Sequence, residues 1–208
     1  MINVKYLIFS ITLIVSTILS LYIYSEESKK ERSVNLDANI KVLNRGEDSI
    51  TLKPGYEKIG TLQARKVESW SRETPSSSMR VAQYKIDYIK GSGQLVVFSG
   101  IGGSPDENIE RWYKQFKSES NLSIAEIASK WEIVKEKLNI KFVHFKGTYM
   151  KSDMRMNSVT EELKDYALLA AIISGANEPY YFKMTGPSSL IKSQISLFES
   201  FINSIQKL

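Results

Sequence analysis

The sequence predicts an α+β fold: an antiparallel β-sheet flanked by helices, preceded by one amino-terminal transmembrane helix. Three observations support this prediction. Residues 82–88 alternate between apolar and polar side chains, the period of a half-buried strand. Residues 191–205 place apolar side chains at spacings of four and three, which is typical of an amphipathic helix that packs on a sheet. Residues 6–24 carry no charge.

The composition narrows the classes of function. The chain has 208 residues and a net charge of +5, and its 28 basic residues are interleaved with 23 acidic ones. A nucleic-acid surface requires basic residues that cluster with stacking aromatics, so we expect no nucleic-acid partner. The chain has no cysteine and one histidine, His144, so thiolate sites are excluded and a histidine-based metal site is hard to build. We expect no metal, no cofactor and no catalytic residue.

The amino-terminal segment is predicted to be an uncleaved signal anchor. After a short tail at residues 1–5, the run at 6–24 approaches the roughly 20 apolar residues that a helix needs to cross a bilayer. The alternative is a cleaved signal peptide, but the bulky residues 21–23 make a poor cleavage site. Basic residues at 29–32 oppose export under the positive-inside rule. We nevertheless expect a single-pass protein of the bacterial inner membrane with a periplasmic domain.

The rest of the chain divides into a linker and one domain. Residues 25–65 are polar, with a strand-like piece at 49–55, and are expected to form a linker and possible first strands. Residues 66–208 are expected to form the globular α+β domain. The elements expected in it are strands at 80–89 and 94–99 around a turn at Gly91–Gly93, a helix over 105–116, a helix start at Ser123, strands at 131–137 and 140–149 around a turn at Leu138–Asn139, a polar connection over 150–165, a strand at 180–186 and a helix from Pro187.

The run Tyr166–Ser174 is ambiguous. Its leucines and alanines favour a helix, but an uninterrupted apolar run that ends in a glycine-containing turn also fits a central strand buried on both faces. We favour the strand.

The stretch Gly100–Ser104 joins a strand to a helix, a position where proteins often bind phosphate. It lacks the lysine of a P-loop, and the carboxylates at 106–107 would repel phosphate. Ser104 begins a complete capping-box sequence. A structural turn is therefore expected. The alternative is an enzyme or small-ligand receptor that uses a pocket at Gly102, Gly103 and Ser104.

Three aromatic or imidazole side chains are further candidates. His144 shares strand parity with apolar neighbours, so we expect a packed histidine, and a ligand-binding or basic role is the alternative. Tyr180 and Tyr181 are adjacent at a strand start, so one of the two rings should point outward and is available for contact with a partner.

The chain resembles a group of bacterial proteins that combine an amino-terminal export or anchor segment with a PsbP-like α/β sandwich. The resemblance extends from about Trp70 to Leu208. The residues that carry it are Trp70, Pro75, Met79–Ala82, the Val96–Phe98 strand with its glycine-rich turn, Asn108–Trp112, Gly147–Tyr149 and Tyr181–Pro187. It implies an accessory or assembly module beside a membrane complex and transfers no site residue. The membrane span of this chain departs from soluble PsbP-type proteins.

Together these features predict a membrane-anchored, extracytoplasmic binding or assembly module that is not catalytic. Its expected partners are membrane lipid, through residues 6–24, and another envelope protein. A further hypothesis is a weak attraction of the scattered lysines to anionic lipid.

Overall fold

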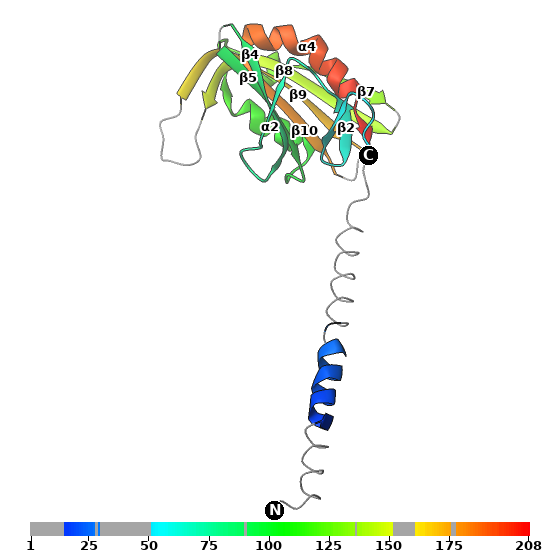
Figure 1. Ribbon diagram of the computed structural model, residues 1–208. Helices are drawn as coiled ribbons and strands as arrows, with labels where there is room; N and C mark the ends of the chain where they lie inside the picture. Colours follow the sequence, from blue (N-terminus) through cyan, green and yellow to red (C-terminus); the bar gives the residue numbers. More distant parts are fainter. Residues whose placement is uncertain are drawn as a thin grey trace, which may run out of the picture. The chain divides into compact units, whose positions relative to one another are not determined.

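The computed structural model describes residues 15–27, 29, 51–89, 91–135, 137–151, 161–175 and 178–208 (Figure 1). The chain divides into two units, Met1–Thr51 and Leu52–Leu208. In the first unit, residues 15–27 are helical. The remaining part of the predicted membrane segment, residues 6–14, lies outside the described residues. Within the described residues, no helix combines the length and the apolar character that crossing a membrane requires.

The second unit is built on an eight-stranded sheet whose pairings are all antiparallel. The predicted α+β class is therefore confirmed. In spatial order the strands are β3 (Ser71–Glu73), β4 (Arg80–Tyr88), β5 (Gly91–Ser99), β10 (Tyr180–Pro187), β9 (Glu161–Ser174), β8 (Leu138–Lys151) and β6 (Phe116–Lys117), and β7 (Ser129–Lys135) also pairs with β8.

A smaller sheet joins the start of this unit to its end. It consists of β1 (Tyr56–Ile59), β2 (Leu62–Arg65) and β11 (Gln206–Lys207), in that order. Ile59 and Leu62 are fully buried in the main core. The compact unit therefore begins at Leu52 rather than at residue 66. Of the strand-like piece expected at 49–55, the described residues from Thr51 onward form no strand.

Helices cover both faces of the large sheet. Helix α4 (Ser188–Asn203) lies along one face, while α2 (Pro105–Tyr113) and the single turn α3 (Ile124–Ile127) pack against the other (Figure 1). The sheet therefore separates two apolar cores. The α4 core is the larger and includes Trp70, and the α2 core includes Trp112.

The ambiguous run at Tyr166–Ser174 is part of strand β9, so the strand prediction is confirmed. Every residue from Ala167 to Ile173 is buried. Leu169 packs in the α4 core and Leu168 in the α2 core. Both faces of this strand are covered, which explains why its sequence shows no alternation.

Two predicted turns are displaced. Gly91–Gly93 lies within β5 and not in the turn, because the register pairs Tyr88 directly with Gly91. Position 93 has little room for a side chain: a Cβ atom there would lie 2.7 Å from the Leu190 side chain of α4 and 3.2 Å from the Thr185 carbonyl oxygen. Leu138–Asn139 likewise belongs to β8, since Lys135 pairs with Leu138.

The polar connection expected over 150–165 is wrong at both of its ends. Strand β8 runs on to Lys151 and β9 begins at Glu161, and the register pairs these two residues. Their polar side chains are exposed on a two-stranded extension of the sheet, so the sequence pattern resembles that of a loop. Residues 152–160 lie outside the described residues.

Candidate functional site

Hydrogen bonds to residues of α2 hold the glycine-rich turn that precedes this helix. Ser104 is the N-cap: its hydroxyl accepts from the backbone N–H of Glu107, and the Glu107 carboxylate accepts from the backbone N–H of Ser104 at 2.6 Å. The capping-box prediction is therefore confirmed. The hydrogen bond from the Ser104 backbone is the main reason that the pKa of Glu107 is lowered.

The carbonyl groups of this turn are also occupied. Gly102 O accepts from Arg111 Nη1 at 2.9 Å, and Gly103 O accepts from the Tyr181 hydroxyl at 3.3 Å. Gly103 has φ of 93°, and a Cβ atom there would lie 2.8 Å from Arg111 Nη2. The glycine thus allows a left-handed backbone and a close approach of Arg111. The carbonyl groups of Gly102 and Gly103 and both capping groups of Ser104 therefore serve the fold.

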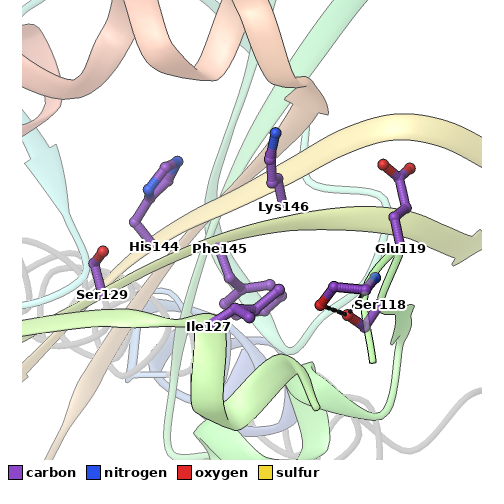
Figure 2. A pocket seen from close by; sticks show the side chains of 8 residues that line it. Ser118, Glu119, Ile127, Ser129, His144, Phe145 and Lys146 are labelled. Carbon is purple, nitrogen blue, oxygen red and sulfur yellow. Dashed lines mark hydrogen bonds between the residues drawn. The ribbon is translucent and has the colours of Figure 1, made fainter. Parts of the chain in front are cut away.

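His144 lies at a different place, on the outer edge of β8. The β7 ladder ends with the pair Ser129–His144, and the β6 ladder begins only at Thr148. A cavity of about 500 Å³ adjoins the gap between them (Figure 2). Its lining residues are Ser118, Glu119, Ser120, Ile127, Ser129, His144, Phe145 and Lys146. No residue of the Gly100–Ser104 turn is among them, so the structure does not bring the predicted site residues together.

The side chains around this cavity do not form a nucleophile–base pair. In Figure 2 the His144 and Lys146 side chains point to one side of β8 and the Phe145 ring to the other. The hydrogen bond drawn there joins the hydroxyls of Ser118 and Ser120, 3.1 Å apart. Burial lowers the pKa of His144, because the charged form of the imidazole is disfavoured away from water.

The prediction that Tyr180 or Tyr181 points outward is wrong, because both rings are only 1% exposed. β10 is a central strand covered on both faces, so Tyr180 packs in the α4 core and Tyr181 in the α2 core. The Tyr180 hydroxyl accepts from the Thr61 backbone N–H at 2.8 Å. Neither ring offers a surface to a partner.

A second pocket, of about 480 Å³, crosses the sheet on the face that carries α2. Tyr181, Lys183 and Thr185 alternate on β10 and therefore share this face. Tyr181 packs against Trp112 of α2, whereas Thr185 lines the pocket beyond the helix. We call this cavity the sheet pocket. Its lining residues are Glu73, Arg80, Lys85, Ser92, Gly93, Gln94, Tyr149, Lys151, Leu163, Tyr166 and Thr185.

A buried lysine adjoins the sheet pocket. Lys183 is 9% exposed, and its ammonium donates to Gln115 Oε1 at 2.5 Å. The same nitrogen lies 5.8 Å from the centroid of the Tyr149 ring, which lines the pocket. Burial, with a smaller contribution from the Arg80 charge, lowers the pKa of Lys183 to about 8.

The two cations Arg80 and Lys183 have no acidic partner in the described part of the chain. No carboxylate there lies within 4.0 Å of either group. Arg80 Nη1 instead donates to Gln83 Oε1 at 2.7 Å, and Gln83 donates onward to Glu73. Lys183 is buried and Arg80 is half-buried. Because buried charges are usually paired, this arrangement is a candidate binding site.

Two other lysines on the rim are paired. Lys85 forms an ion pair with Asp87 at 2.7 Å, and Lys151 forms one with Glu161 at 3.0 Å. Among the residues that line the sheet pocket, Arg80 is therefore the cation without an acidic partner. Lys183 is not itself a lining residue and adds its charge from beside the Tyr149 ring.

Comparison with known proteins assigns no family here. No protein-family model and no curated protein matches the chain. The described residues contain no group of three or more histidine, aspartate or glutamate side chains placed to hold a metal ion.

Sequence reasoning did not find the sheet pocket. One signal was present: Lys183 interrupts the apolar run Tyr180–Met184, where a central strand carries no charge without a reason. The position of Arg80 beside it depends on the order β4-β5-β10, which local patterns do not reveal.

The structural role of the turn at Ser104 is testable. Ser104→Ala should lower the free energy of unfolding by about 1 kcal/mol at pH 7, since the N-cap bond is lost. The folded-state pKa of Glu107 lies below its unfolded value. The stabilisation by the Ser104–Glu107 capping box is therefore fully present above the unfolded pKa. It is lost as the pH falls through the folded pKa. Urea titrations at several pH values measure this.

The control for this experiment is Ser196→Ala, an exposed position on α4. It should change stability by less than about 0.5 kcal/mol. An equal, pH-independent loss in both variants would contradict the capping role.

Proposed function

We propose that the chain is a non-catalytic binding module that residues 6–24 anchor in the bacterial inner membrane, with its domain on the periplasmic side. The observation that carries the binding role is the sheet pocket. It opens across β4, β5, β10, β9 and β8, where α2 does not cover the sheet. A cavity of this volume lies in the range of ligand sites in proteins, roughly 300–1,000 Å³. The partner we propose is another envelope protein.

Two features support an accessory module. The α+β domain, with helices on both faces of an antiparallel sheet, fits the PsbP-like sandwich that the sequence resembles, and such domains generally assist membrane complexes. The groups at the pocket are mainly hydrogen-bond donors and aromatic rings, which suit recognition. The cavity at His144 and the turn at Gly100–Ser104 offer no comparable set of converging groups.

Site-specific crosslinking in intact cells tests the proposal. A photoreactive amino acid at Ser92, on the pocket rim, should crosslink the full-length chain to an envelope protein. The same amino acid at Ser196, on the exposed side of α4, should not. Gln94→Trp fills the pocket and should abolish the Ser92 crosslink. Membranes washed with carbonate should retain the protein.

Three results would count against this function. The anchor fails if carbonate extracts the chain. The binding surface fails if Ser92 and Ser196 give the same crosslinks, or if Gln94→Trp leaves them unchanged.

A further inference from the structure

The unused donors of the sheet pocket indicate the chemistry of its ligand. An ammonium group has three N–H donors and a guanidinium group has five, yet the structure shows one side-chain hydrogen bond each for Lys183 and Arg80. In the described part of the chain, the hydroxyls of Tyr149, Tyr166 and Thr185 have no hydrogen-bond partner at all. The ammonium and guanidinium groups can only donate, whereas a hydroxyl can donate or accept, so a ligand that satisfies the whole set must carry acceptor atoms.

The local charge favours a single negative charge. Arg80 and Lys183 contribute two positive charges, and Glu73 contributes one negative charge through the Gln83 amide. The remaining charge of about +1 matches a carboxylate better than a doubly charged phosphate. The planar fork of an arginine also fits the two oxygens of a carboxylate.

One wall of the pocket is aromatic. The rings of Tyr149 and Tyr166 stack with centroids 6.2 Å apart and planes inclined by 19°. Both side chains are half-buried, so a face or an edge is available for contact. Rigid aromatic side chains next to charged donors are typical of protein-recognition surfaces.

We propose that the sheet pocket recognises an acidic peptide segment of the partner and holds one of its carboxylates between Lys183 and Arg80. The hydroxyls of Tyr149, Tyr166 and Thr185 complete the donor set. This inference rests on the proposed function, because it names the chemistry of the partner at the same pocket.

Titration of the full-length chain in a neutral detergent tests the inference. The probe is an end-blocked peptide of three glutamates, and its matched control is the corresponding peptide of three glutamines. The readouts are calorimetric affinity and the thermal unfolding temperature, followed by tryptophan fluorescence. Binding to the folded state should raise the unfolding temperature with increasing peptide concentration. The glutamine peptide should have no effect.

The decisive variants remove one donor each. Lys183→Met and Arg80→Gln should each weaken binding of the glutamate peptide roughly tenfold or more, the usual cost of losing a charged hydrogen bond. Lys192→Met removes the same charge from an exposed position on α4 and should leave the affinity unchanged. Because the folded state of each variant is checked by its unfolding transition, misfolding is not mistaken for lost binding.

Several outcomes would overturn the inference. Equal binding by wild type and Lys183→Met would place the peptide elsewhere. Tighter binding of inorganic phosphate, or of phosphatidylglycerol vesicles over phosphatidylcholine vesicles, would replace the carboxylate by a phosphate group. A Ser92 crosslink that Gln94→Trp abolishes but Lys183→Met does not would leave the proposed function standing with a neutral partner. If Gln94→Trp also leaves the Ser92 crosslink unchanged, the proposed function and this inference are both contradicted.

Discussion

Lys183→Met should raise the free energy of unfolding by about 2–3 kcal/mol at pH 7. Burial lowers the pKa of this lysine from 10.5 to about 8, and each tenfold change in proton affinity is worth about 1.4 kcal/mol. Methionine has a similar shape without the charge. It leaves Gln115 without its donor, but Gln115 is only half-buried and can bond to water, so the loss is small.

Lys183 also makes the free energy of unfolding depend on pH. The folded-state pKa of Lys183 lies below the unfolded value of 10.5, so between about pH 8 and 10.5 the unfolded chain binds more protons. Wild-type stability therefore rises with pH in this window. The advantage of Lys183→Met is complete below pH 8 and disappears as the pH reaches 10.5.

Urea unfolding of the wild type and the variant at four pH values between 7 and 10.5 measures this difference. Lys192→Met, at an exposed position, should stay within about 0.5 kcal/mol of wild type throughout. A loss of stability in Lys183→Met at pH 7 would mean that the ammonium is compensated within the fold. The case for an unfilled binding site would then lose its main support.

A buried lysine that destabilises the folded state indicates a role in binding. Natural proteins keep destabilising groups mainly where binding or chemistry requires them. Lys183 lies beside Tyr149, which lines the same pocket as Arg80, and neither cation has an acidic partner in the described residues. A bound carboxylate would raise the pKa of Lys183 and recover the free energy that burial costs.

The α+β class and most elements follow from the sequence. Alternation identifies β4, and the capping boxes at Ser104 and Ser123 mark the starts of α2 and α3. The displaced turns depend on tertiary contacts. Gly93 looks like part of a turn, but it lies in β5, where Leu190 of α4 approaches it closely. Strand-to-strand register is set by such packing, and local propensity does not predict it.

The candidate site was less predictable than the fold. His144 and the turn at Gly100–Ser104 stand out in the sequence by residue type and motif, and the structure separates them. The sheet pocket is lined by residues of six strands, β3–β5 and β8–β10, two groups that are about 40 residues apart in the sequence. Only the lysine inside an apolar strand gave a local signal, because a charge at a buried position needs compensation.

Phe201→Ala should give the largest loss of stability, about 4 kcal/mol. Phe201 is 1% exposed and holds α4 on the sheet. Its ring centroid lies 5.0 Å from that of Trp70, 6.3 Å from that of Tyr84 and 6.0 Å from that of Phe182. Truncation removes the buried ring and leaves a cavity that these large side chains cannot readily fill.

The matched control for this truncation is on the same helix. Leu197 is 36% exposed, so Leu197→Ala should cost less than about 1 kcal/mol. Urea unfolding of the full-length chain, followed by tryptophan fluorescence, compares the two. A small protein domain is stable by only about 5–15 kcal/mol, so Phe201→Ala removes a large share of that margin. Because α4 and the sheet pocket lie on opposite faces, the variant that remains folded should still bind the glutamate peptide. A loss of affinity in the folded fraction would show that the α4 core controls the shape of the pocket.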